Sequence, residues 1–367
     1  MILFLENLMT RNIAQQHLNQ SLDCGCNLSR RSFAGGLAAL GAGSLLLPEG
    51  LLAQSPFPPA KRIDVHHHFG SPDWFRQARA AGGGGVSSWS VQGTLADMDL
   101  GGVAKSVLSV IQPGTWFTSD QQARSLAREI NDFAAKLRSD HPTRFGIFTT
   151  LSMPDVEGSL RELEYGMDVL GADGVGLFTS YGPKYLGDAA FSPLLSELNR
   201  RKAVVYVHPS NPSCCANILP GITGPSTIEY ATDTTRTMAS LLFSGAASRY
   251  PDIRWIWSHS GGTMPFLFSR FQVQEVGLGA KAKAIIPNGV MYEMKKFYYE
   301  TAQGNTPMQL AALTKMIPIS QIMFGSDYPY RPAMECVEGL EAYRFKRADL
   351  QAIEYGNAHR IMPKLKV

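Results

Sequence analysis

The stretch Ile63-Asp-Val-His-His-His68 joins a short apolar segment to three consecutive histidines. Side chains alternate between the two faces of a strand, so His66 and His68 share one face while His67 points to the other. Two imidazoles on one face at the end of a buried strand suit metal binding. We therefore expect this strand to carry part of a functional site at its C-terminal end.

Seven further apolar segments follow, and the strand starts are on average about 37 residues apart, near the length of one βα unit. Together with Ile63–His68, the expected strands are Ala104–Val110, Phe145–Thr150, Gly174–Phe178, Val204–His208, Trp255–Ser258, Phe297–Glu300 and Gln321–Gly325. Apolar residues at helical spacing occur between them, in Ser119–Ser139, Gly158–Leu170 and Pro193–Arg200. Eight such units predict an α/β fold, a closed (β/α)8 TIM barrel. A doubly wound open sheet is the alternative, but no Gly-x-Gly-x-x-Gly turn follows the first strand.

Length and composition agree with one barrel. The chain has 367 residues, of which 44% are hydrophobic, and a barrel of about 250–300 residues plus extensions accounts for them. We assign residues 55–367 to the barrel. The net charge is only +3 and no Lys/Arg cluster occurs, so we expect no nucleic-acid partner.

Residues 1–54 have a different character. Ser29-Arg-Arg-Ser-Phe33 precedes the Gly/Ala-rich, mildly apolar run Ala34–Leu47, a pattern typical of a twin-arginine export signal. The run is shorter than the about 20 residues that a membrane span needs, so we expect no stable membrane anchor. This interpretation predicts a periplasmic enzyme. The alternative is a buried N-terminal helix with a chance arginine pair, in a cytoplasmic protein.

The cysteines indicate no disulfide framework. Cys24 and Cys26 fall in the leader, which leaves Cys214, Cys215 and Cys336 in the barrel. The adjacent pair is either a vicinal disulfide or two ordinary loop cysteines.

Three further candidate residues follow other strands. His208 ends the fifth expected strand, His259 follows the sixth and Asp327 follows the eighth. The C-terminal ends of barrel strands meet at one mouth, so these side chains should converge with His66 and His68. Imidazole and carboxylate ligands favour Zn²⁺, with Mn²⁺ or Fe²⁺ as alternatives. We expect His66, His68, His208 and Asp327 to bind one divalent ion and His259 to transfer protons, since imidazole titrates near neutral pH.

Several segments, in order, carry a family resemblance over Arg62 to Leu365. They are Ile63-Asp-Val-His-His-His68, Val107-Leu-Ser-Val-Ile-Gln-Pro-Gly114, His208-Pro, Thr234-Thr-Arg-Thr237, Trp257-Ser-His-Ser-Gly-Gly-Thr-Met-Pro265, Phe324-Gly-Ser-Asp-Tyr-Pro-Tyr330 and Gly356-Asn-Ala358. The chain resembles the amidohydrolase superfamily, a metal-dependent hydrolase type of barrel. Within it, the resemblance is to the branch of aminocarboxymuconate-semialdehyde and 6-methylsalicylate decarboxylases (amidohydrolase-related family 2).

The resemblance implies roles for individual residues. It gives the four ligands above and implies His259 as the catalytic acid/base. His259, Asp327 and the metal-bound water remain the alternatives for delivering the proton. It implies that Arg270 binds a substrate carboxylate, in some members from the neighbouring subunit, so we expect a homodimer. Arg236 is a weaker candidate for the same task.

The resemblance also limits the metal content. Binuclear members carry a lysine at the end of strand four, where this chain has Gly174-Val-Gly-Leu-Phe178 and no lysine before Lys184. We therefore expect one ion. Related resorcylate-type decarboxylases have Glu-x-His where this chain has His66-x-His68, a difference that favours zinc.

The predicted function is metal-dependent, non-oxidative decarboxylation of a small aromatic or enol carboxylic acid. Metal-dependent hydrolysis of a lactone or small ester is the alternative, because the same ligands serve both reactions. A non-catalytic exported binding protein is the third hypothesis. Aromatic residues near strand ends are expected to wall a flat substrate pocket; these are Trp116, Phe117, Phe178, Tyr181 and Tyr328.

Overall fold

The computed structural model describes residues 61–82, 89–215 and 224–367. The predicted export signal within residues 1–54 lies outside the described residues. The described part between 61 and 367 forms one compact unit.

Eight parallel strands form the central sheet of the described chain, in the order β1-β2-β3-β4-β7-β8-β9-β10. Their bounds are β1 Arg62–Phe69, β2 Val103–Val110, β3 Phe145–Thr150, β4 Gly174–Phe178, β7 Val204–His208, β8 Arg254–Trp257, β9 Tyr298–Glu300 and β10 Ile322–Met323. Strands β5 (Ser180–Tyr181) and β6 (Lys184–Tyr185) form a small separate hairpin. All eight predicted strands are confirmed, and β3, β4 and β7 have the expected bounds.

Backbone hydrogen bonds between β1 and the chain around β10 close the sheet into a barrel. The amide of Val65 donates to the carbonyl of Phe324 at 3.1 Å, and the amide of Asp327 donates to the carbonyl of His66 at 2.8 Å. The predicted TIM barrel is therefore confirmed, and the open-sheet alternative is wrong. Closure also brings the first and last sequence motifs together.

Strand β10 is shorter than predicted. Beyond Met323 the backbone leaves β9 and turns toward Asp64, whose carboxylate accepts hydrogen bonds from the amide and the hydroxyl of Ser326. Gly325 permits this path, because a Cβ there would overlap the carboxylate of Glu300. The strand ends early because the chain exchanges sheet pairing for contacts to buried carboxylates.

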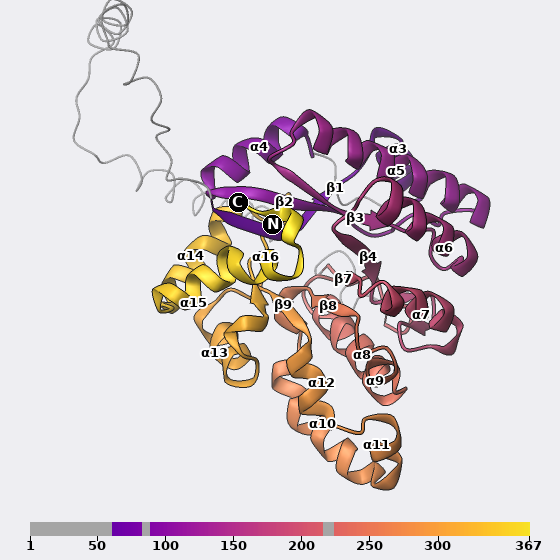
Figure 1. Ribbon diagram of the computed structural model, residues 1–367, viewed down its shortest axis with the longest axis vertical. Coiled ribbons are helices and arrows are strands. Elements are labelled where there is room, and N and C mark those ends of the chain that lie inside the picture. Colours follow the sequence, from indigo (N-terminus) through magenta and orange to yellow (C-terminus); the bar gives the residue numbers. More distant parts are fainter. Residues whose placement is uncertain (1–60, 83–88, 216–223) are drawn as a thin grey trace, which may run out of the picture. The chain divides into compact units, whose positions relative to one another are not determined.

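Helices surround the strands in Figure 1. Their bounds are α3 Pro72–Ala80, α4 Val91–Leu100, α5 Asp120–Asp140, α6 Val156–Glu164, α7 Ser192–Arg200, α8 Glu229–Phe243, α9 Ala246–Arg249, α10 Met264–Leu278, α11 Ala280–Ile285, α12 Val290–Lys296, α13 Pro307–Met316, α14 Ala333–Tyr343, α15 Arg347–Gln351 and α16 Asn357–Ile361. The short helical turns are Tyr165–Val169, Ala189–Phe191, His259–Gly261, Ile319–Gln321, Ala352–Gly356 and Pro363–Leu365.

The predicted helices agree with these bounds within a few residues. Helix α5 begins after Ser119, whose hydroxyl accepts a hydrogen bond from the amide of Gln122 and so satisfies a free helix-end donor. Helix α6 continues into a π turn over Tyr165–Val169, which together cover the predicted stretch to within two residues. Among the described residues, no helix has the length and apolar character needed to cross a membrane.

Two apolar clusters support the barrel mouth. One fills the barrel interior with Ile63, Val65, Val107, Phe148, Tyr206 and Ile256, all at most 1% exposed. The other lies between the strands and the surrounding helices. Because both clusters are densely buried, the strand ends that carry the polar residues are held in fixed positions.

Candidate metal centre and substrate cavities

Four predicted ligands converge at the C-terminal mouth. His66, His68, His208 and Asp327 are each at most 3% exposed, and one ligand atom from each lies within 4.8 Å of the others. The two Nε2 atoms of His66 and His68 are 2.9 Å apart, and each is 3.0 Å from Oδ1 of Asp327. His67 points away, as predicted, and its Nδ1 contacts Asp64 Oδ2 at 3.1 Å.

Hydrogen bonds on the far side of each ring determine which nitrogen is free. Nδ1 of His66 donates to Oε1 of Glu300 at 2.8 Å, and Nδ1 of His208 donates to the carbonyl of Pro209 at 2.8 Å. Nδ1 of His68 faces the carbonyl of Ser109 at 3.4 Å. Carboxylate and carbonyl oxygens only accept, so the protons sit on Nδ1. The three Nε2 lone pairs therefore point at a common centre.

Asp327 supplies the test of whether a cation fits. Its buried Oδ1 has no hydrogen-bond donor among the described residues, although Nε2 of His66 and Nε2 of His68 are 3.0 Å away. In the metal-binding form, with the single ring proton on Nδ1, those nitrogens present lone pairs rather than protons. An anionic oxygen buried among lone pairs needs a cation, and ligands about 2.1 Å from one ion lie about 3 Å apart at right angles. The cluster is thus a divalent metal site.

The electrostatics agree with that assignment. Burial lowers the pKa of His68 to about 4 and keeps that of His208 well below its usual range. Burial alone would raise the pKa of Asp327, but the neighbouring imidazoles hold it well below the usual range. These are the deprotonated forms that bind metals. His66 differs: burial opposes charge on its ring, yet Glu300 and Asp327 raise its pKa to about 10, so without a cation the ring carries a second proton, which a bound ion would displace.

Two buried carboxylates that were not predicted as site residues orient the ligands. Glu300, at the end of β9, accepts from Nδ1 of His66 through Oε1 and from the amide of Ala302 through Oε2 at 2.6 Å. Asp64 accepts from the amide of His66 at 3.0 Å and from Ser326. Carboxylates behind a ligating histidine fix its ring and raise its basicity.

His259 and Gln303 approach the outer oxygen of Asp327. Nε2 of His259 lies 3.5 Å from Oδ2, and the amide of Gln303 donates to the same atom. His259, Gln303 and Asp327 all have left-handed backbones, with φ of 51°, 49° and 68°. Such conformations cost about 1–3 kcal/mol each and concentrate at functional sites. Here they turn all three side chains toward one point.

These residues open into a cavity of about 410 Å³. Its lining includes Gln112, Tyr230, His259, Gln303, Asp327 and Arg331. Arg331 was not predicted; its side chain is 52% exposed, and its nearest acidic partner, Glu335, is 3.9 Å away. The sequence signal for it was its position four residues after Asp327.

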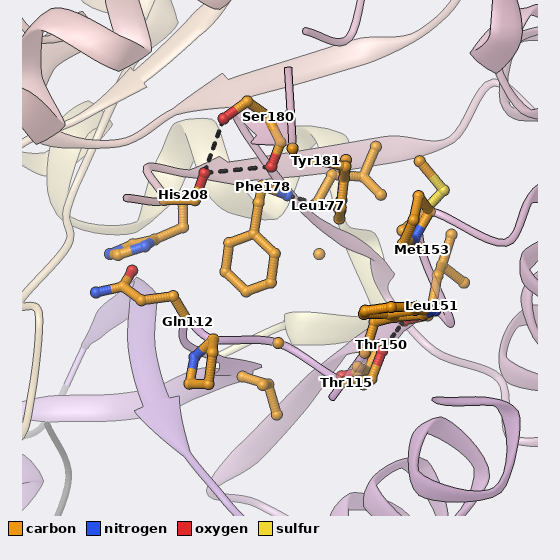
Figure 2. Close-up of a pocket in the computed structure, with 18 of the residues that line it drawn as sticks. Gln112, Thr115, Thr150, Leu151, Met153, Leu177, Phe178, Ser180, Tyr181 and His208 are labelled. Carbon is orange, nitrogen blue, oxygen red and sulfur yellow. Dashed lines mark hydrogen bonds between the residues drawn. The ribbon is translucent and has the colours of Figure 1, made fainter. Parts of the chain in front are cut away.

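A second cavity of about 540 Å³ shares Gln112 and His208 with the first. Figure 2 shows these two residues on one side, with Leu151 and Met153 opposite and Phe178 between. Of the five aromatic residues expected to wall a pocket, Trp116, Phe178 and Tyr181 line this second cavity.

The other two aromatic residues have different positions. Phe117 packs against the core cluster, and Tyr328 stacks on His67 with ring centroids 4.9 Å apart.

The two predicted arginine sites lie elsewhere in this protomer. Arg270 is exposed on α10, and it lines neither cavity. Arg236 contacts Sγ of Cys215 at 3.2 Å from α8. Sγ of Cys215 is 2.8 Å from Sγ of Cys214, and both thiols are free in this structure. Within one protomer, the ligands and His259 come together but the two arginines do not join them.

A cation site at the C-terminal mouth of a parallel barrel, with an imidazole beside it, defines a metal-dependent enzyme of the amidohydrolase type. The sequence profile of the amidohydrolase family matches residues 63–364. The chain therefore belongs to the amidohydrolase family.

Relatives narrow the chemistry. A decarboxylase of Aspergillus niger is 34% identical over 328 residues, covering 83% of this chain and 88% of its own length. The 6-methylsalicylic acid decarboxylase of Penicillium expansum is 35% identical over 317 residues, covering 83% and 97%. These matches confirm the prediction of a decarboxylating enzyme over the hydrolase and the binding protein.

A solved structure supports the fold. Dihydroxybenzoic acid decarboxylase from Polaromonas, with bound manganese, has a TM-score of 0.71 and 23% identity, covering 83% of this chain and 98% of its own. At that identity the likeness confirms the barrel alone.

Proposed function

We propose that this enzyme removes the carboxyl group of a small hydroxylated aromatic acid of the salicylate type, without oxidation. The observation that carries the proposal is the convergence of three imidazole lone pairs and Oδ1 of Asp327 beside His259 in one cavity. The relatives at 34–35% identity, one of them named for 6-methylsalicylic acid, support this substrate class.

The reaction needs stabilisation of the charge that develops as the bond to the carboxyl group breaks, and a proton for the ring carbon. The bond between the ring carbon and the carboxyl carbon breaks, its electron pair stays on the ring and carbon dioxide leaves. A bound divalent ion supplies Lewis-acid stabilisation of the charge that develops. His66, His68, His208 and Asp327 hold the ion.

The ring carbon must then receive a proton. We assign this step to His259, which lines the cavity with a side chain only 12% exposed and lies 3.5 Å from Oδ2 of Asp327. Gln303 donates to the same oxygen, so Oδ1 of Asp327 stays directed toward Nε2 of His66 and His68, where it would hold the ion. His259 and Asp327 are the proposed catalytic pair; their contact must shorten from 3.5 Å to about 3 Å for direct proton exchange.

The test is carbon dioxide release from a panel of hydroxybenzoic acids by the metal-loaded protein. We expect turnover that falls by about 10²–10⁴-fold in His259→Gln, the range for a lost acid–base group, with metal content unchanged. Turnover of lactones in a parallel panel, without carbon dioxide release from any acid, would overturn the proposal in favour of hydrolysis.

We propose Zn²⁺ as the native ion, because three of the four ligand atoms are imidazole nitrogens. Elemental analysis of the protein purified without added metal tests this. If the protein contains stoichiometric manganese and is fully active, the native ion is manganese rather than zinc. The fold and the ligand assignment would be unaffected.

We also propose a homodimer in which Arg270 reaches the partner's cavity. Helix α10 exposes Phe266, Val273 and Val276 by 70–80% on the surface that also carries Arg270. Exposed apolar side chains at this spacing favour burial against another subunit. Together with α11 and α12, the helix extends away from the strands in Figure 1.

A mixing experiment tests the shared site. Arg270→Ala and His259→Gln subunits, each inactive alone, should regain about a quarter of wild-type activity when co-expressed, because a mixed dimer contains one intact site. A monomer in sedimentation, or full activity of Arg270→Ala alone, would overturn this proposal and leave Arg331 as the nearest arginine.

We further propose export through the twin-arginine segment Ser29–Phe33. Cell fractionation of wild type against Arg30→Lys/Arg31→Lys tests it. Wild type should reach the periplasm and the variant should not; equal cytoplasmic retention of both would overturn it.

A further inference from the structure

The second cavity is larger than the one at the metal site and has a different chemical character. Among the described residues that line it there is no Asp, Glu, Lys or Arg, whereas the metal cavity contains Asp327 and Arg331. Its far side is formed by Leu151, Met153 and Leu177, each at most 4% exposed. A space of about 300–1,000 Å³ is typical of ligand pockets, so this one has the capacity to bind a sizeable apolar group.

The two cavities meet at a narrow polar boundary. Gln112 and His208 line both of them, and the amide of Gln112 donates to the hydroxyl of Tyr230. The Tyr230 hydroxyl in turn donates to Asn211 at 3.2 Å. A ligand held at the metal therefore has the apolar space directly beyond His208, which is itself a metal ligand.

We infer that the second cavity binds an apolar substituent, an alkyl chain of several carbons, on the ring of the acid whose carboxyl group lies at the metal. The inference rests on the proposed function and specifies its substrate class as alkyl-substituted hydroxybenzoic acids. A hydroxybenzoic acid without an alkyl substituent would leave the apolar cavity filled with water. Each CH₂ group buried there should raise kcat/KM by about fourfold, the factor that corresponds to its transfer from water.

Gly176 offers a way to fill this cavity without disturbing the barrel. It lies in β4 between the buried residues Val175 and Leu177, yet it is itself partly exposed and lines the cavity. A Cβ there would have ordinary contacts only, 3.8 Å from Phe148 Cβ and 3.9 Å from the carbonyl of Thr149. Gly114 is unsuitable, because it has a φ of +78° and a Cβ would lie 2.8 Å from the ring of Phe178.

The test compares salicylates that carry a methyl or a pentyl group at each free ring position. For at least one position we expect wild-type kcat/KM to rise about 100-fold or more from methyl to pentyl, as four buried CH₂ groups require. Gly176→Leu should bring the pentyl-to-methyl ratio of kcat/KM close to one, because its side chain would occupy space that the longer chain needs. Gly176→Ala is the matched control and should keep most of the gain.

Met153→Ala tests the same cavity by enlarging it instead of filling it. It enlarges the far side, so the preferred chain length should increase by one or two carbons. Thermal unfolding of each variant shows whether it folds.

The possible failures are distinguishable. Slower turnover of the pentyl acids than of the methyl acid at every ring position, with the methyl acid still releasing carbon dioxide, would overturn this inference alone. The same loss of methyl and pentyl turnover in a well-folded Gly176→Leu variant would also overturn it. No carbon dioxide from any acid would overturn the proposed function.

Discussion

The two cavities at the barrel mouth are built by opposite halves of the same sheet. The metal cavity takes His259, Gln303 and Asp327 from the chain after β8, β9 and β10. The apolar cavity takes Val110, Thr150 and Phe178 from the ends of β2, β3 and β4. His208 ends β7, which lies between these halves in the sheet order. On the proposed function, this division separates the residues that perform the chemistry from those that select its substrate.

The halves also differ in how rigidly they are specified. On the metal side, three residues with left-handed backbones and the buried Glu300 restrict the positions of the ligand side chains and of His259. On the apolar side, contacts are mainly van der Waals, which tolerate changes of shape if volume is kept. We therefore expect substitutions on the metal side to change rate and metal affinity, and substitutions on the apolar side to change substrate preference.

His208→Ala should have the largest effect, because it removes a ligand that both cavities share. Loss of the ion removes several kcal/mol of charge stabilisation, so carbon dioxide release should fall more than about a thousandfold. Elemental analysis and a rate measurement check this. His141→Ala, a partly buried histidine at the end of α5, should keep metal and rate. A metal-free but active His208→Ala protein would contradict the assigned site.

Glu300→Gln should weaken metal binding by about 10–100-fold, the usual cost of losing a carboxylate behind a ligating histidine. Competition with a chelator measures the affinity. Glu293→Gln is the matched control, because Glu293 is equally buried but bonds to Ser248 and Lys296. If both variants lose stability and neither loses metal affinity, Glu300 is a structural acid only, and the two halves of the mouth are less different than proposed.

The sequence predicted all four metal ligands but not Glu300 and Asp64, the carboxylates that orient them. Strand alternation and the common direction of parallel strands place His66, His68, His208 and Asp327 from local pattern alone. Glu300 contacts His66 across 234 positions, a pairing set by barrel closure rather than by any local period.

Some signal for these supporting residues was nevertheless present. Glu300 ends a predicted strand at the same barrel end as the ligands, and Asp64 lies inside the Ile63–His68 motif. The apolar cavity had weaker signals, since Gly176 and Met153 acquire meaning only when four strand ends surround one space.

Gln303→Met should produce an intermediate effect. The variant keeps side-chain length but removes the hydrogen bond to Oδ2 of Asp327. A hydrogen bond to a charged group contributes about 1.5–3 kcal/mol, so kcat should fall by about tenfold or more, with metal content unchanged. Gln321→Met, which removes an amide bonded to Lys296 and Phe297 carbonyls, is the control and should keep kcat. An equal loss in both would show that stability, not the position of Asp327, is affected.

Tyr206→Phe should have the smallest effect and gives the sharpest test of the apolar half. Tyr206 lines the apolar cavity, its ring stacks on Phe148 with centroids 5.4 Å apart, and its buried hydroxyl has no hydrogen-bond partner among the described residues. Burial holds the pKa of Tyr206 well above its usual range, so the hydroxyl stays neutral. Removing an unpaired buried hydroxyl should leave the free energy of unfolding unchanged or raise it by up to about 1 kcal/mol.

Chemical denaturation measures the free energy of unfolding of Tyr206→Phe, and its kcat should stay within about twofold of the wild-type value. A loss of about 1 kcal/mol, or a tenfold lower kcat, would mean that the hydroxyl has a partner in the working enzyme. The apolar half would then share in the chemistry, and the division between the two cavities would fail at Tyr206, whose ring centroid lies 5.3 Å from that of His66.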